Sequence, residues 1–116
     1  LYDTDMQQQL AWGVSLENVF SPYIEKLPRN VYLSIDIDGL EPLNCPNTGT
    51  PVPGGLRYGE LENLIFMVVR SGRNIIGFDL CEVGDSVDGW DANVGSRILY
   101  QLCGALLASQ GKIPYK

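Results

Sequence analysis

The chain contains no histidine, and this absence excludes several kinds of chemistry at once. Its 116 residues cannot alone supply a Ser-His-Asp triad, a Cys-His pair, a histidine general base or a histidine metal ligand. A metal site built from this chain alone must therefore use oxygen donors or the three cysteines.

Cysteines and long apolar runs are also scarce. Cys45, Cys81 and Cys103 are odd in number and widely spaced, without a Cys-x-x-Cys pair. This pattern favours reduced thiols in the cytoplasm over a framework of disulfides. No apolar run approaches the roughly 20 residues that span a bilayer, and no signal-peptide pattern is present.

Basic residues are fewer than acidic ones. Eight Lys and Arg stand against 14 Asp and Glu, which gives a formal net charge of −6. A surface of this sign repels phosphate backbones and anionic lipid, so we expect neither nucleic acid nor membrane as a partner. It attracts cations instead, whether metal ions or cationic small molecules.

The remaining composition is that of one globular domain, 45% hydrophobic and 19% charged. Two short apolar segments, residues 31–36 and 74–80, are typical of strands buried on both faces of a parallel sheet. Helical spacing of apolar residues follows each strand, at residues 58–71 and 92–109, the second helix with Asp91 as its N-cap. The order strand, helix, strand, helix predicts an α/β fold.

The first thirty residues carry weaker signals. Residues 4–12 fit a short helix or a loop. Ser15 can cap a brief helix through Phe20, and the Ser21-Pro22 pair then predicts the start of a second short helix that ends before Pro28.

Residues 39–55 form a long loop between the first strand and the first long helix. Its several Pro and Gly residues restrict the backbone, which is typical of an ordered loop rather than a linker. A loop of this length inside a compact domain is usually functional.

Two aspartates, Asp36 and Asp38, mark the carboxyl end of the first strand. Residues two apart in a strand project to the same side, so we expect their carboxylates to lie together. Hard oxygen donors suit Mg²⁺ or Mn²⁺. A strand-end turn explains Asp-x-Asp equally well, although a carboxylate ending an apolar strand is costly unless it is paired or bound to metal.

Other polar residues follow the strands. Glu82 ends the second strand, and it approaches the Asp36 pair if the two strands are neighbours; otherwise it is a solvated acid. Thr48 and Thr50, in the stiff loop, can orient a ligand or its water, or only satisfy the backbone of a turn.

Together these segments resemble the ureohydrolase motif of arginases and agmatinases. The matching runs are SIDIDGLEP at 34–42 and PNTGTPVPGGL at 46–56. The family motif has Ser-aromatic-Asp-hydrophobic-Asp, then Asp-Pro, Pro-x-x-Gly-Thr-Pro and Gly-Gly-Leu. The run GFDLCEV at 77–83 is similar to a family strand that ends in Glu-Val.

The resemblance implies a three-layer α/β/α fold around a parallel sheet, and two Mn²⁺ ions that activate water to release urea from a guanidinium group. Asp36 and Asp38 match the family's paired metal ligands, the first bridging both ions. Glu82 matches the acid that anchors the guanidinium, and Thr50 a hydroxyl that holds the substrate or its water. Family members commonly form homo-oligomers.

The sequence departs from the family pattern at several places. Ile35 replaces the usual aromatic residue and Glu41 the usual Asp before Pro42, and both changes are mild. Gly84-Asp85 stands where the family usually has Asn-Pro, which affects the substrate side of the site. The family's Gly-Gly-Asp-His and Asp-Ala-His-x-Asp segments, which carry its other metal ligands, do not occur. We therefore expect residues 1–116 to be the C-terminal part of a single ureohydrolase domain whose N-terminal part is absent, and to be inactive alone.

The sequence also fits two other interpretations. A haloacid-dehalogenase-type, Mg²⁺-dependent phosphatase also places Asp-x-Asp after a buried strand, but it prefers Thr or Val where Leu40 stands. Alternatively, the chain is a non-catalytic piece that only self-associates through its unpaired strand edges.

Overall fold

The computed structural model describes residues 4–114. In chain order its elements are helix α1 (Thr4–Ala11), helix α2 (Leu16–Ile24), strand β1 (Asn30–Asp36), the 3-10 turn η1 (Ile37–Gly39), helix α3 (Tyr58–Arg70), strand β2 (Asn74–Cys81) and helix α4 (Trp90–Ser109). The predicted order of strand, helix, strand and helix is confirmed, with strand bounds that differ by one residue.

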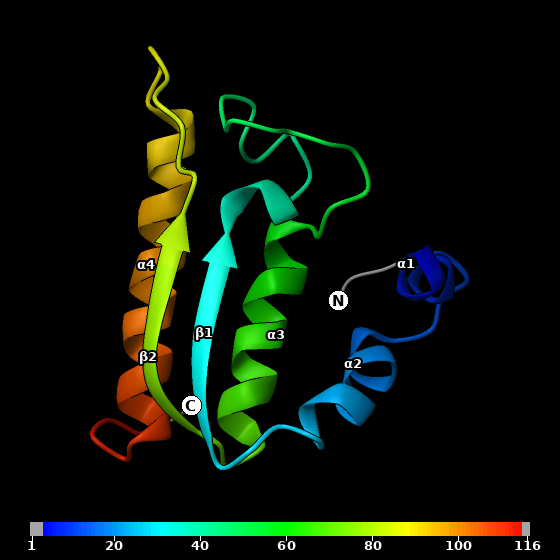
Figure 1. The fold of residues 1–116 in the computed structure, drawn as a ribbon, viewed down its shortest axis with the longest axis vertical. Helices are drawn as coiled ribbons and strands as arrows, with labels where there is room; N and C mark the ends of the chain where they lie inside the picture. The colour runs from blue at the N-terminus through cyan, green and yellow to red at the C-terminus, as the bar shows by residue number, and fades with distance from the viewer. Residues whose placement is uncertain (1–3, 115–116) are drawn as a thin grey trace.

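The two strands run parallel, as predicted, and they are neighbours, which the sequence left open (Figure 1). Their register pairs Val31 with Ile75 and Asp36 with Cys81. A shift between Val31 and Tyr32 leaves Ile76 of β2 without a partner on β1. This irregularity lies near the amino ends of the strands, so the carboxyl ends remain in regular register.

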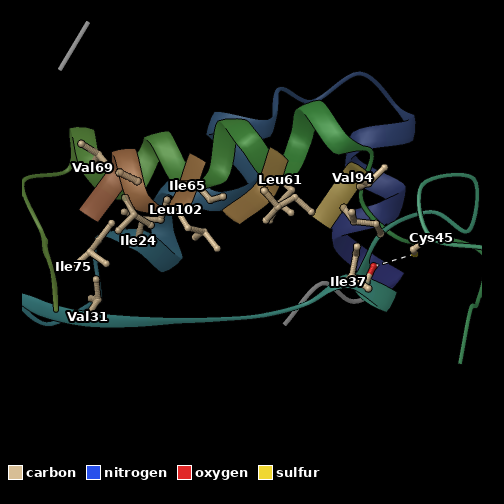
Figure 2. Close-up of a cluster of buried hydrophobic side chains, with 14 residues drawn as sticks. Ile24, Val31, Ile37, Cys45, Leu61, Ile65, Val69, Ile75, Val94 and Leu102 are labelled. Carbon is tan, nitrogen blue, oxygen red and sulfur yellow. Dashed lines mark hydrogen bonds between the residues drawn. The ribbon is translucent and has the colours of Figure 1, made fainter. Parts of the chain in front are cut away.

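Helices α3 and α4 cover one face of the strand pair, and α2 packs beside α3 (Figure 1). The core lies between these layers (Figure 2) and contains Val31, Ile65, Ile75 and Leu102. Along β1, residues with even numbers face the other side and are exposed, as the period of two in a strand requires. Residues 4–114 thus form one helical layer and part of the sheet of the expected three-layer fold.

The predictions for the first thirty residues need correction. Residues 4–11 do form a helix, but α2 continues through Ser21 and Pro22 instead of breaking there. Pro22 removes one backbone donor from the helix. Packing compensates, because Val19 and Ile24 on either side of it are buried.

Asp91 is not the N-cap of the last helix, contrary to the prediction. The helix begins one residue earlier, at Trp90, and Gly89 occupies the N-cap with a left-handed φ of 68°. Asp91 lies in the first helical turn and is fully buried. Among the described residues, no helix has both the length and the apolar composition needed to cross a bilayer.

Candidate functional site

The predicted site residues gather at the carboxyl ends of the two strands. Asp36 is the last residue of β1, and Asp38 lies in the η1 turn that follows. The expectation that both project from a continuing strand is wrong, because the chain turns directly after Asp36. The Asp38 backbone N–H donates to Asp36 Oδ1 at 3.2 Å, so the turn rather than the pleat brings the two residues together.

Thr50 also reaches this edge, although twelve residues separate it from Asp38. Its Oγ1 donates to Asp38 Oδ2 at 2.6 Å. The short distance fits a hydrogen bond to an ionised carboxylate. The hydroxyl therefore orients one of the two predicted metal ligands, a contact that the sequence alone did not reveal.

Glu82 follows β2, at the same edge of the sheet as Asp36, as expected for neighbouring parallel strands. Its φ of 63° lies in the left-handed region, where a residue other than glycine is uncommon. The stiff loop contacts it at two points. Thr48 Oγ1 donates to the Glu82 carbonyl at 2.8 Å, and a Cβ placed on Gly49 would lie 3.2 Å from Glu82 Oε2.

Backbone pairing closes the base of the long loop. Leu56 N–H donates to Gly39 O, and Glu41 N–H donates to Leu56 O, both at 2.9 Å. Only glycine fits at position 55, because a Cβ there would lie 2.4 Å from the Leu40 carbonyl carbon. The buried Cys45 thiol donates to Ile37 O at 3.1 Å inside the loop (Figure 2). The loop is thus an ordered part of the site.

A contact that sequence reasoning missed ties this loop to α4. Asp91 Oδ2 accepts from the Asn47 backbone N–H at 2.9 Å, and Oδ1 accepts from Asn47 Nδ2 at 3.0 Å. The two partners lie 44 positions apart, so the sequence alone did not reveal their contact. An acid at the start of a helix predicted an N-cap instead.

The electrostatics of the site follow from burial and from crowded carboxylates. Desolvation raises the pKa of Asp36, and the nearby Asp38 carboxylate adds to this effect, although the Asp38 backbone N–H acts in the opposite direction. Desolvation also raises the pKa of Cys45, with further contributions from Asp91, Asp38 and Asp36. The smaller, like-charge part of both shifts comes from carboxylates at this edge of the sheet, and a bound cation would compensate it.

The donor set fits part of a metal centre for a hard divalent ion. Asp36 and Asp38 offer carboxylate oxygens, which Mn²⁺ and Mg²⁺ accept. Within residues 4–114, however, no three or more side chains of His, Cys, Asp or Glu lie close enough together to hold a metal ion. Two carboxylates at this edge are therefore an incomplete ligand set.

Adjacent parallel strands, with acidic groups and a stiff loop at their carboxyl ends, define an α/β protein whose candidate ligand is a cation. Comparison with known families makes the class specific. The model of the Arginase family matches residues 5–104, and the chain belongs to this family. The phosphatase interpretation is thereby set aside.

Individual relatives agree with this assignment. The chain is 39% identical over 90 residues to the N(1)-aminopropylagmatine ureohydrolase of Thermococcus kodakarensis, covering 77% of this chain and 31% of that protein. It is 35% identical over 109 residues to the agmatinase of Bacillus subtilis, covering 84% of this chain and 38% of that protein. The chain thus spans about a third of the length of these curated relatives.

Solved structures also share the fold. The proclavaminate amidino hydrolase of Streptomyces clavuligerus superposes with a TM-score of 0.66 at 31% identity, over 84% of this chain and 31% of that one. An arginase from Bacillus subtilis gives a TM-score of 0.70 at 26% identity, over 85% of this chain and 35% of that one. The described helices and strands therefore form a partial arginase-like domain.

Proposed function

We propose that these residues are the C-terminal part of a manganese-dependent ureohydrolase, which hydrolyses a guanidino compound to urea and an amine. The carrying observation is the convergence of Asp36, Asp38, Thr50 and Glu82 at one edge of the sheet. Membership of the Arginase family supports the reaction class. Relatives named agmatinase, guanidinobutyrase and arginase make arginine, agmatine and related guanidino compounds the substrates to test.

Asp36 and Asp38 would hold Mn²⁺ in this proposal. Bound Mn²⁺ supplies a water of lowered pKa and stabilises developing negative charge. Asp38 is restrained from two sides, by the turn that follows Asp36 and by the Thr50 hydroxyl. Such restraint presents the carboxylate oxygens in a fixed direction, which a metal ligand requires.

Glu82 would anchor the cationic guanidinium group of the substrate. A carboxylate matches the planar N–H donors of a guanidinium in both charge and geometry. The loop at Thr48 and Gly49 restrains this residue, and its left-handed backbone is a form of strain often found at functional sites. Thr50, through its contact with Asp38, lies where it can also hold the substrate or its water.

The donor set within residues 4–114 is incomplete. Because the chain has no histidine and spans about a third of its relatives, we propose that a preceding segment supplies imidazole ligands. We also propose a homo-oligomer, which the resemblance to the ureohydrolases implies. The three free cysteines fit a reducing compartment such as the cytoplasm.

The test is urea release by the full-length protein that contains this chain, loaded with Mn²⁺. The substrate panel is arginine, agmatine, 4-guanidinobutyrate and aminopropylagmatine, and Asp38→Asn is the control variant. We expect urea from at least one compound and loss of release in the variant. A manganese-loaded protein that releases urea from none of them contradicts the proposal.

A second measurement tests the division of ligands. We expect residues 1–116 alone to bind Mn²⁺ weakly or not at all, because too few ligands are present. Calorimetry that found two tightly bound Mn²⁺ per chain would contradict this expectation.

A further inference from the structure

We propose that Asp91, in the first turn of α4, is a positioning residue that fixes Glu82 for recognition of the guanidinium group. It acts through the loop segment 47–49, which lies between the two acids. This inference rests on the proposed function, because it gives Asp91 a role in the same site.

Asp91 holds the loop by two hydrogen bonds, both donated by Asn47. Its carboxylate is fully buried, and its two oxygens accept from the backbone and the side chain of Asn47 at 2.9 and 3.0 Å. Burying an ionised carboxylate is costly unless hydrogen bonds compensate it. The bidentate contact compensates it while fixing both the position and the orientation of Asn47.

The fixed loop in turn encloses the backbone of Glu82. Thr48, only 5% exposed, donates its hydroxyl to the Glu82 carbonyl at 2.8 Å. Gly84 packs so closely that a Cβ there would lie 2.0 Å from the Asn47 carbonyl oxygen. The same short segment therefore contacts the chain at Glu82 and two residues after it.

The loop also lies close to the carboxylate of Glu82. A Cβ placed on Gly49 would lie 3.2 Å from Glu82 Oε2. The left-handed backbone at Glu82 is uncommon for a residue with a side chain and persists only when its surroundings impose it. Loss of the Asp91 contact would release segment 47–49 and with it these restraints.

The residue two positions after Glu82 fits this role. The close approach of the Asn47 carbonyl requires a glycine at position 84. A larger residue at position 84 would therefore displace the Asn47 backbone from the chain after Glu82. Asp91 holds Asn47 in this place from α4.

The experiment compares three variants of the full-length protein. Asp91→Leu roughly keeps the size of the side chain but removes both acceptors, so it loses both hydrogen bonds from Asn47. The double variant Asn47→Asp with Asp91→Asn exchanges donor and acceptor between the two side chains and keeps two hydrogen bonds. Asp5→Leu makes the same chemical change at an exposed acid in the first turn of α1 and is the matched control.

Two readouts follow from the proposed geometry. In Asp91→Leu, we expect KM for the guanidino substrate to rise roughly ten- to hundredfold, with kcat and Mn²⁺ content little changed. Amide hydrogen exchange should accelerate at residues 47–49 and 82–84, and stay unchanged in the middle of α4. The double variant should recover both readouts, and the control should alter neither.

The outcomes separate this inference from the proposed function. Unchanged KM and unchanged exchange in a folded Asp91→Leu protein overturn the inference, as does a double variant that behaves like Asp91→Leu. If the unmodified protein releases no urea, the proposed function fails. Exchange at residues 47–49 and 82–84 then still decides whether Asp91 positions the loop and Glu82.

Discussion

The two ends of the β1–β2 pair are built from different chemistry, although the same two strands reach both. The amino ends are joined by neutral and cationic donors that meet backbone and amide acceptors. The carboxyl ends hold acidic side chains that crowd one another. At the amino ends, hydrogen bonds within the chain satisfy the polar groups. At the carboxyl ends, negative charge remains for a ligand to balance.

At the amino ends, polar groups find partners within the chain. Arg73 donates to the Glu25 carbonyl at 2.8 Å and to the Ser71 carbonyl at 3.0 Å. Asn74 Nδ2 donates to Asn30 Oδ1 at 3.1 Å across the strand pair. Hydrogen bonds of this kind stabilise the folded chain without requiring a ligand.

At the carboxyl ends, hydrogen bonds orient the acids but do not neutralise them. Thr50 donates to Asp38, and Asn47 donates to Asp91. None of these donors carries a charge. The comparison teaches that polar groups satisfied within the chain and acids that keep their charge lie at opposite ends of the strands, the acids at the carboxyl ends, where parallel sheets bind ligands.

The largest expected effect comes from reversing a charge at the carboxyl end. Asp36→Lys places a cation where the proposal requires one to bind, so we expect loss of Mn²⁺ and a fall in urea release of about 10³-fold. Metal analysis and urea assays of the full-length protein measure this. Glu25→Lys makes the same change at the amino end and should preserve activity. Equal losses of urea release in the two variants would contradict the difference between the two ends.

A smaller effect is expected for the guanidinium anchor. Glu82→Gln retains the shape but removes the charge that pairs with a cationic substrate, so kcat/KM should fall roughly 100-fold. The Mn²⁺ content should stay unchanged. Glu17→Gln, on the exposed surface of α2, is the control. A wild-type kcat/KM in Glu82→Gln would remove Glu82 from the proposed site.

The amino end should affect stability rather than activity. Arg73→Ala leaves the carbonyls of Glu25 and Ser71 without their charged donor, and we expect about 1–2 kcal/mol less stability. Thermal unfolding followed by circular dichroism checks this. Urea release at a temperature where the variant is folded should match the unmodified protein. A selective loss of activity would contradict the separation of the two ends.

The smallest effect lies between the two ends, on the exposed face of the sheet. Ser34 Oγ donates to Asp79 Oδ1 at 2.9 Å, and this bond lowers the pKa of Asp79. A folded pKa below the unfolded value adds stability at neutral pH, and that stability is lost as pH falls through the folded pKa. Ser34→Ala should therefore raise the pKa of Asp79, measured by NMR titration, and weaken stability only above that range.

Ser96→Ala serves as the control for this titration. Its hydroxyl bonds the Asn93 carbonyl within α4, away from Asp79. The pKa of Asp79 should not move in this variant. An unchanged pKa in Ser34→Ala as well would show that the hydroxyl is not the cause of the shift.

Much of the fold was predictable because the signals are local. Two apolar runs predicted parallel strands, and the spacing of apolar residues predicted α3 and α4. The break at Ser21-Pro22 was wrong because burial of Val19 and Ile24 overrides the local proline signal. The cap at Asp91 was wrong because its partner, Asn47, is distant in sequence.

By itself, the sequence determined the chemistry that is possible: acids, hydroxyls and stiff turns without a histidine. Its motifs also determined the family, since residue identity at fixed spacing is a local property. Only the tertiary structure decided which groups meet. Thr50 reaches Asp38, and Asp91 holds the loop beside Glu82, because folding brings together residues separated by 12 to 44 positions. The absent histidine thus limits what these residues can do alone, whereas their arrangement brings the two candidate metal ligands, Asp36 and Asp38, together.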